Sequence, residues 1–409
     1  MATVVLLGTL DTKGKEYDYL RERVREQGVD VVLVDAGVFE PLAEADVSQD
    51  EVAAAAGTKI AALREAGDRG AAVDAMGRGG AEVVRRLHEE SRLDGILTVG
   101  GSGNSSIGAQ AMRVLPVGVP KLIVSTLASG DTRPYVGATD VSMTYSVVDI
   151  SGLNRISERI LSNAAGAIAG MAKIALPEME SGEAKLLRKP LIGASMFGVT
   201  TPSVTRARER LEELGYEVLV FHATGTGGQS MEALARGGFL AGVLDITTTE
   251  LADELVGGVL SAGPDRLETA GELGLPQVVS LGALDMVNFG PRETVPPHFE
   301  GRNLYVHNPT VTLMRTTPEE CAELGRQIAR KLSAATGPTA LFVPLKGVSM
   351  IATEGGPFYD PAADDALFGA LRDGLAANVE VHELDLDVND PAFAEAMADR
   401  LDQMIRETR

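Results

Sequence analysis

The sequence has few of the residues on which several common kinds of protein chemistry depend. Its 409 residues include one cysteine, no tryptophan and five histidines. With Cys321 as its single cysteine, the chain cannot form an internal disulfide, and this usage fits a reducing cytosol. The histidines show no HxxxH or HxH spacing, so a zinc site is not expected. We expect Cys321 to be a buried, unreactive thiol in the helical segment 316–332.

Basic residues and long apolar runs are also scarce. The chain has 37 Lys and Arg against 58 Asp and Glu, a formal net charge of -21, which argues against a nucleic-acid partner. No apolar stretch is long enough to span a membrane, and no basic leader precedes the strand-like segment 3–9. We therefore expect a cytoplasmic protein with a small-molecule ligand and no membrane contact. Acidic α/β proteins rich in Ala and Gly are often dimers, and we expect a homodimer.

The order of apolar and helical patterns predicts the fold class. In the first half, strand-like runs at 3–8, 29–35, 95–101 and 121–128 alternate with helical patterns. A second alternation starts at 191 and includes strand-like runs such as "TALFVPLKG" and "RNLYVHNP" (302–309). Such alternation is typical of parallel sheets with helices on both faces. We expect an α/β fold of two Rossmann-like open parallel-sheet domains, residues 1–180 and 188–409, with an interdomain cleft and a polar linker at 176–190.

The stretch "VGGSGNSSIGAQAMRVLP", from Val99 to Pro116, joins a buried strand to a helical pattern. Backbone N–H groups exposed at such a helix start form a site for anions, most often phosphate. The alternative is a tight turn in which glycine merely supplies a positive φ. The stretch is not a P-loop, because no Lys-Ser/Thr pair follows its last glycine.

A second polar cluster, "GTLDTKG" (Gly8 to Gly14), directly follows the first strand-like run. Lys13 could neutralise a phosphate, and the hydroxyls of Thr9 and Thr12 could donate hydrogen bonds to it. Asp11 could accept from a ribose or bind the water shell of a magnesium ion. The alternative is that Asp11 caps a helix N-terminus while Lys13 is solvated. A third cluster, at 125–140, holds Asp131 and Arg133, and its alternative is a surface loop.

In the second half, polar residues again follow strand-like runs. The segment "HATGTGG" resembles a backbone nest for a second anion, "ITTT" is flanked by two carboxylates, and a third carboxylate lies in "GALDMVNFG". Parallel strands end at one edge of a sheet, so we expect these groups to line one cleft that faces the turn at 100–103. The alternatives are a structural histidine and carboxylates that cap turns. The residues concerned are His222, Gly225, Gly227, Gly228, Asp245, Glu250 and Asp285.

Together, these segments resemble a known family over nearly the whole chain. The carriers are "GTLDTKG", "GGSGNSS", "VSTLASGDTRPYVG", "DISGLNRIS", "FGVTTPSV", "FHATGTGG", "LDITTTEL", "GALDMVNFG" and "HNPTVTLMRTT". They resemble the ATP-binding domain family named after the tomato mosaic virus resistance protein, most of whose members have no assigned activity. The resemblance implies a two-domain α/β fold with ATP bound by the N-terminal domain. The plant member uses that domain to block viral RNA replication.

The resemblance also implies which residues contact ATP. The carried-over positions are Gly8, Thr9, Asp11, Thr12, Lys13, Gly100, Gly101, Ser102 and Gly103, with Asp131 and Arg133 nearby. Family members commonly have Gly-Gly-Thr after the Gly-Gly-Ser, where this chain has Gly103, Asn104 and Ser105. Asn tolerates the left-handed conformation, and Ser105 keeps the hydroxyl that Thr would supply, so we expect both to belong to the ATP site. Because this departure from the family pattern lies in the expected phosphate-binding turn, the property that it affects is the affinity for phosphate.

Three functions remain open. The first is an ATP-dependent enzyme, a kinase or ligase for a small polar or acidic metabolite. In it, Lys13, Arg133, the amides of 100–103 and Mg²⁺ would stabilise charge, and the C-terminal glycines, Asp245 and Glu250 would hold the substrate. Its proton acceptor would be Asp285 or Asp131, and His222 is a third candidate for this role. The second is a nucleotide-binding regulatory or interaction protein without turnover. The third is an ATP-independent lyase or hydrolase of a small acid.

Overall fold

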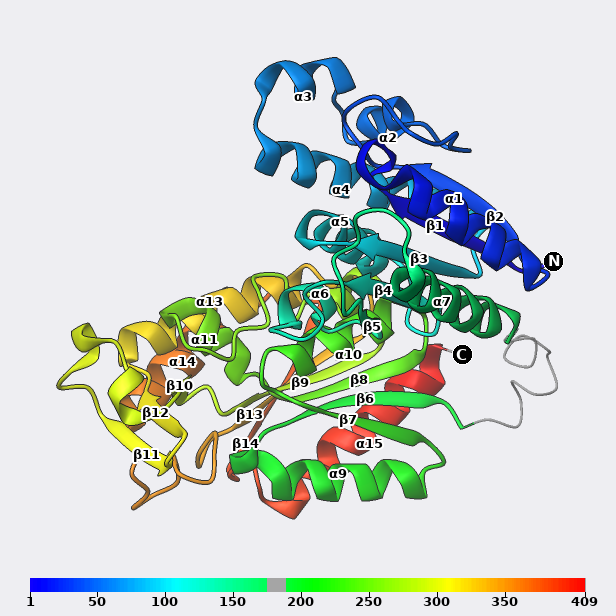
Figure 1. The fold of residues 1–409 in the computed structure, drawn as a ribbon. Helices are drawn as coiled ribbons and strands as arrows, with labels where there is room; N and C mark the ends of the chain where they lie inside the picture. The colour runs from blue at the N-terminus through cyan, green and yellow to red at the C-terminus, as the bar shows by residue number, and fades with distance from the viewer. Residues whose placement is uncertain (175–188, 409) are drawn as a thin grey trace. The chain divides into compact units, whose positions relative to one another are not determined.

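The chain forms two compact units, each built around a parallel β-sheet. The computed structural model describes residues 1–174 and 189–408, and the two units comprise residues 1–181 and 182–409 (Figure 1). The predicted α/β class with two parallel-sheet domains is confirmed. Most of the predicted linker lies outside the described residues. None of the described helices is both long enough and apolar enough to cross a membrane.

The N-terminal unit contains a five-stranded parallel sheet in the order β2-β1-β3-β4-β5. Its strands are β1 (Thr3–Gly8), β2 (Asp30–Asp35), β3 (Gly95–Gly100), β4 (Lys121–Ser125) and β5 (Ser142–Tyr145). Its helices are α1 (Leu10–Glu26), α2 (Gln49–Ala55), α3 (Ile60–Ala66), α4 (Arg69–Glu89), α5 (Ser102–Arg113), α6 (Arg133–Val136) and α7 (Arg155–Lys173). The chain leaves β1 toward β2 and then crosses back to β3. The switch point of this doubly wound sheet therefore lies between β1 and β3, where ligands of such sheets bind.

The alternation of side chains along β1 explains why helices cover both faces of this sheet. Val4 and Leu6 pack on one side with residues of α1 and α7. Val5 and Leu7 pack on the other side with residues of α2, α4 and α5. A strand buried on both faces reads as a continuous apolar run, which is why the sequence predicts it well. The short strand β5 was not predicted, because most of its side chains are exposed and it lacks such a run.

The C-terminal unit has a six-stranded parallel sheet in the order β14-β13-β9-β8-β6-β7. Its strands are β6 (Leu191–Met196), β7 (Glu217–His222), β8 (Leu240–Thr247), β9 (Gln277–Gly282), β13 (Thr339–Pro344) and β14 (Val379–Leu384). Its α-helices are α9 (Thr201–Glu213), α10 (Thr226–Arg236), α11 (Thr249–Val256), α12 (Thr269–Glu272), α13 (Pro318–Ser333), α14 (Pro361–Gly374) and α15 (Pro391–Thr408). The order again places a switch point at its first strand, between β6 and β8. The two units thus share a strand order although the sequence shows no repeat.

The predicted assignment of 302–309 to the parallel sheet is wrong. This segment contains β11 (Leu304–Asn308), which belongs to a separate antiparallel sheet with β12 (Val311–Arg315) and β10 (Met286–Phe289). Only Pro309 and Thr310 lie between β11 and β12. A connection that short can join antiparallel strands, whereas a parallel pair needs a crossover of a dozen residues or more.

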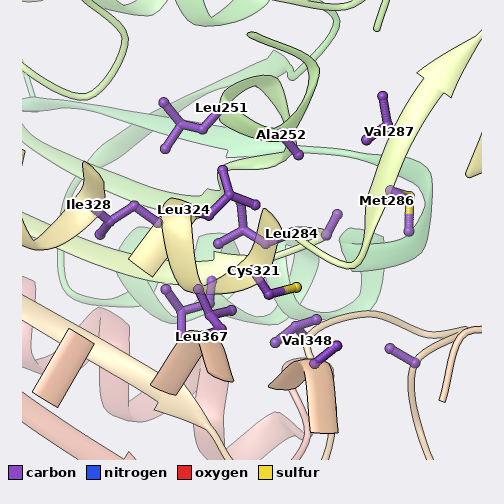
Figure 2. Close-up of a cluster of buried hydrophobic side chains, with 14 of the residues drawn as sticks. Leu251, Ala252, Leu284, Met286, Val287, Cys321, Leu324, Ile328, Val348 and Leu367 are labelled. Carbon is purple, nitrogen blue, oxygen red and sulfur yellow. The ribbon is translucent and has the colours of Figure 1, made fainter. Parts of the chain in front are cut away.

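A hydrophobic core joins α11, α13 and α14 to the turn after β9 (Figure 2). Cys321 projects into it from α13, near Leu284, Leu324 and Val348. The thiol is buried, and burial raises its pKa above the usual value. The prediction of a buried thiol is confirmed, and a thiol with a raised pKa is a poor nucleophile.

Candidate functional site

A tyrosine holds the carboxyl ends of β1 and β3 apart. The two strands pair only as far as Leu6 and Leu97. Beyond that point the hydroxyl of Tyr17 donates to the carbonyl of Leu7 (2.7 Å) and accepts from the N–H of Val99 (2.8 Å). A Cβ on Gly8 would lie 2.1 Å from the Tyr17 ring, so the first glycine of the "GTLDTKG" motif makes room for this ring. The opening at the switch point therefore depends on a tyrosine that the sequence pattern did not single out.

A cavity of about 600 Å³ lies at this switch point. It brings together the two glycine-containing motifs of the first half, which are about ninety residues apart. Its polar lining comes mainly from the loops after β1 and β3, and its apolar lining from 36–39 and 63–76. The predicted site residues in its lining are Thr9, Asp11, Thr12, Lys13, Gly101, Ser102, Gly103 and Asn104.

The first turn of α5 points unpaired backbone donors toward the cavity. The N–H groups of Ser102, Gly103 and Asn104 have no acceptor in the described part of the chain, whereas Ser105 N–H donates to the carbonyl of Gly101 (3.0 Å). These donors and the positive end of the helix dipole make the turn suited to an anion. The predicted strand-to-helix arrangement of this stretch is confirmed, with α5 beginning at Ser102.

The Asn104 side chain joins the two glycine-containing motifs. Its Oδ1 accepts from the N–H of Thr9 (3.0 Å), and its Nδ2 donates to the Thr9 hydroxyl (3.0 Å). Because that hydroxyl already accepts a proton, its own proton is available to Thr12 Oγ1, 2.8 Å away. Asn104 lies inside α5 and does not use a left-handed conformation, so that part of the expectation is wrong. A side chain at this position aligns Thr9 and Thr12 beside the α5 N-terminus.

Asp11 and Lys13 are both engaged by the protein itself. The N-cap of α1 is Thr9, so the alternative in which Asp11 caps the helix is wrong. Asp11 Oδ2 accepts from the N–H groups of Val38 (3.0 Å) and Phe39 (2.9 Å), while its Oδ1 is buried and has no partner in the described residues. The Lys13 ammonium donates to the carbonyl of Ile150, so Lys13 is not simply solvated.

Most of the remaining lining comes from segments that carry no motif. Ala36, Val38, Leu63, Val73 and Met76 form an apolar wall. Charged side chains also line the cavity, and they are Arg64, Asp68, Arg69 and Asp149. Asp149 lies in the "DISGLNRIS" segment, whereas the other residues reach the site through the packing of the β2–α2 loop, α3 and α4, and no local sequence signal marks them. The cavity thus has a donor-rich end and an apolar wall.

Three predicted cofactor residues of the loops lie outside the lining. Gly8 accommodates the Tyr17 ring, as described above. A Cβ on Gly100 would lie 2.6 Å from Asn104 Nδ2, so Gly100 leaves room for the Asn104 side chain. The Ser105 hydroxyl pairs with the Ser125 hydroxyl (2.7 Å) in the interior. Each of them supports the shape of the site, and none is placed to touch a ligand in the cavity.

Asp131 and Arg133 do not line the cavity either. Arg133 is 90% exposed and forms an ion pair with Asp131 (3.0 Å) at the start of α6. The pairing raises the pKa of Arg133 and lowers that of Asp131. The geometry corresponds to the surface loop that was the alternative for this segment, and a catalytic role for either residue stays a prediction without geometric support.

The predicted nest in the C-terminal unit already holds an anion, and that anion is part of the chain. Glu250 Oε1 accepts from the N–H groups of Gly225 (2.7 Å) and Gly228 (3.1 Å). A Cβ on Gly227 would lie 1.8 Å from the carbonyl oxygen of His222, so Gly227 allows a close backbone approach. The sequence pattern correctly indicated an anion nest. Its expected opening to a substrate is contradicted, because a buried carboxylate fills it.

Asp245 and Glu250 are also turned inward, toward one buried arginine. Arg266 Nη2 donates to Asp245 Oδ1 (2.7 Å) and its Nε donates to Glu250 Oε2 (2.7 Å). The Ser195 hydroxyl adds a bond to Asp245 Oδ1 (2.6 Å). Burial raises the pKa of Glu250, and the Arg266 charge opposes this rise. These carboxylates stabilise the fold, and their exposure to a substrate, as predicted, is not observed.

Asp285 and His222 lie at different depths of the C-terminal unit. Asp285 is fully buried, accepts from the Ser349 hydroxyl (2.8 Å), and has its pKa raised to about 6 by burial. His222 is exposed at the end of β7, with its ring 5.6 Å from the Phe197 ring. Strands β6 and β8 separate β7 from β9, the strand before Asp285. The two residues therefore do not meet, and a cleft shared with the N-terminal unit stays a prediction.

Comparison with known proteins identifies the relatives of the chain. Residues 2–177 match the N-terminal domain, and residues 189–405 the C-terminal domain, of UPF0261, described as an uncharacterised protein family. A UPF0261 protein of Clostridium tetani is 54% identical over 98% of both chains. The ToMV resistance protein Tm-1 of Solanum lycopersicum is 42% identical over 97% of this chain, which spans 55% of the tomato protein. Among solved structures, UDP-GlcNAc 2-epimerase from Methanocaldococcus jannaschii covers 68% of this chain and 83% of its own, at 9% identity and a TM-score of 0.23, too low to carry an inference.

Proposed function

The chain belongs to the UPF0261 family, and we propose that its N-terminal unit binds ATP in the cavity between the ends of β1 and β3. One observation carries the proposal: at one end the cavity offers helix N–H groups that have no acceptor among the described residues, and an apolar wall runs along another side. Phosphate groups bind at helix N-termini, and apolar walls with a few placed polar groups are typical of cofactor pockets. A ligand with a phosphate chain and a flat, weakly polar base matches both parts.

The roles of individual residues follow from their positions. The first turn of α5, Lys13 and the Thr12 hydroxyl would hold the phosphates, and the wall that includes Val73 and Met76 would contact the base. No group of three His, Cys, Asp or Glu suited to a metal is found among the described residues. Mg²⁺ would therefore enter with the triphosphate and keep several of its own water ligands.

The step that follows ATP binding has two candidate forms. Phosphoryl transfer or ligation of a small polar or acidic metabolite is the first. A nucleotide-binding regulatory or interaction protein without turnover is the second, and the burial of Asp245, Glu250 and Asp285 favours it. Release of ADP or phosphate from ATP in the presence of a panel of small carboxylic acids would distinguish them. The ATP-independent lyase or hydrolase, the cytoplasmic location and the homodimer stay predictions.

ATP is expected to bind more tightly than AMP, because the proposed donors contact the distal phosphates. Calorimetry and thermal unfolding with ATP, ADP and AMP test this, with Mg²⁺ present and absent. At about one hundred times its dissociation constant, ATP should stabilise the N-terminal unit by roughly 2.7 kcal/mol. Equal affinities for ATP and AMP would contradict the assignment of the α5 N-terminus to the phosphates.

The change Ser102→Pro is expected to weaken ATP binding about tenfold or more while α5 stays intact. Proline is tolerated at the first helical position, and this change removes the backbone donor together with the Ser102 hydroxyl. A hydrogen bond to a charged group contributes roughly 1.5–3 kcal/mol, which sets the size of the loss. Ser102→Ala is the matched control, since it removes the hydroxyl and keeps the N–H. Unchanged affinity in Ser102→Pro would move the phosphates away from this turn.

A further inference from the structure

The segment Ser146–Leu153 contributes Asp149 to the cavity lining and the carbonyl of Ile150 to Lys13, but no function has been assigned to it so far. Two polar contacts fasten it to α1. The Lys13 ammonium donates to the carbonyl of Ile150, and the Glu16 carboxylate accepts from the N–H of Gly152 (2.6 Å). Glu16 and Ile150 are buried at these attachments. One of the two fastening residues, Lys13, also lines the cavity.

Lys13 can serve the segment and a ligand at the same time. An ammonium group carries three donors, and only the bond to Ile150 is found in the described residues. The backbone of α1 leaves helical geometry at Lys13, with φ −127° and ψ 17°. Asp149, from the same segment, lines the cavity as well. A phosphate at the α5 N-terminus would therefore meet a lysine that is already bonded to the segment.

The segment holds a conformation that its own sequence does not favour. Val147 has a φ of 63°, in the left-handed region, which is strained for a β-branched residue. A tight turn around it is closed by Val148 N–H donating to Ser146 O (2.6 Å) and by Ser146 Oγ donating to Val148 O (2.7 Å). Such strain persists only where the surroundings hold the backbone. The attachments to α1 are thus needed to keep the segment in place.

We propose that the segment Ser146–Leu153 reports the occupancy of the nucleotide site, through Lys13 bonded at once to a ligand phosphate and to the carbonyl of Ile150. This inference rests on the proposed function. A bound phosphate fixes Lys13, and a fixed Lys13 stabilises the strained segment. By linkage, the segment stabilises the bound nucleotide by the same amount. The apolar side chains in and beside this segment are 38% to 63% exposed, and they are Tyr145, Val147, Leu153 and Ile156. Nucleotide binding would therefore make this exposed apolar surface more rigid.

Hydrogen exchange measured by mass spectrometry tests the proposal, with calorimetry on the same samples. Saturating ATP should slow amide exchange at 148–152 about fivefold or more, the lower range of site-to-site coupling. Lys13→Gln keeps a donor for Ile150 and loses the positive charge, so it should keep the basal exchange of the segment and lose most of the ATP effect at saturation. Lys13→Ala should in addition raise the basal exchange. Lys15→Gln, an exposed position outside the cavity lining, is the matched control and should behave as the unmodified chain.

The possible results distinguish a failure of the coupling from a failure of the proposed function. ATP binding in calorimetry with unchanged exchange at 148–152 overturns the coupling and leaves the proposed function intact. An ATP effect on the segment that survives in saturated Lys13→Gln overturns the role of Lys13. Absence of ATP binding to the unmodified chain overturns the proposed function and the coupling together. Glu16→Ala gives a further check: it removes the acceptor of the Gly152 N–H, so it should raise basal exchange and lower ATP affinity several-fold although Glu16 does not line the cavity.

Discussion

Replacing Arg266 with methionine is expected to lower the free energy of unfolding of the C-terminal unit by about 3–5 kcal/mol, the usual effect of removing one partner from a buried ion pair. Arg266 is fully buried and forms ion pairs with Asp245 and Glu250, and Glu232 lies 3.6 Å from its guanidinium. Methionine fills a similar volume but leaves Asp245 and Glu250 buried without their cation, whereas Glu232 keeps Arg236 (3.7 Å). Urea unfolding followed by circular dichroism measures the change.

Two further variants separate charge from packing in this cluster. Arg326→Met removes an exposed cation from α13, where Arg326 pairs with Glu323 at the surface, and should change stability by less than about 1 kcal/mol. Glu250→Gln keeps an acceptor for Gly225 and Gly228 but loses the charge, so its effect should be intermediate. If Arg266→Met were no more harmful than Arg326→Met, the buried carboxylates would be neutral in the folded protein and the ion-pair account would be wrong.

The donor-rich end of the N-terminal cavity could be predicted because its signals are local. A buried strand, a run of small residues and a helical pattern follow one another within 95–113, and the loop after β1 repeats this order. The apolar wall could not be predicted, because Val38, Leu63 and Met76 reach it only through tertiary packing. Tyr17 was missed for the same reason, since its contact with Val99 spans 82 residues.

The prediction of an open substrate cleft in the C-terminal unit failed because the type of a residue does not show whether its side chain is exposed. Carboxylates after strand ends and a glycine-rich turn are present where the sequence places them. Their partner Arg266 lies in a segment without a pattern, 16 and 21 residues after Glu250 and Asp245. From the sequence alone, the glycine-rich turn and the carboxylate of Glu250 could bind each other, or each could bind a ligand. Only the three-dimensional contacts of Glu250 decide between them.

The stability of the C-terminal unit is expected to fall as the pH rises from about 4 to 7, through Asp253. Burial raises the pKa of this carboxyl from 3.8 to about 7, against the lowering effect of its bonds from Asn288 and Leu260. Below pH 3.8 the folded and unfolded states are both protonated, so the full stability is present. Between these values the unfolded state ionises while the folded state keeps its proton, and the free energy of unfolding falls with rising pH. Above pH 7 the loss is complete.

Asp253→Asn isolates this effect, because the amide cannot ionise. It keeps an oxygen for the N–H groups of Asn288 (3.1 Å) and Leu260 (3.2 Å). The other carboxylate oxygen accepts from Asn288 Nδ2 (2.6 Å), and a turn of the Asn288 amide about its last side-chain bond would place its carbonyl oxygen, unpartnered in the described residues, against the new amide donor. Relative to the unmodified chain, the variant should gain about 3 kcal/mol between pH 4.5 and pH 8, since one pKa unit corresponds to about 1.36 kcal/mol.

Urea unfolding at pH 4.5, 6 and 8 measures this difference for both proteins, which cancels the pH dependence of the other groups. Asp385→Asn changes an exposed carboxylate and should show no pH-dependent gain. Asp285→Asn should show a smaller gain that is complete near pH 6, because the pKa of Asp285 is raised only to about 6. A constant difference between Asp253→Asn and the unmodified chain across this range would mean that Asp253 is ionised in the folded state. Its bonds from Asn288 and Leu260 would then outweigh its burial.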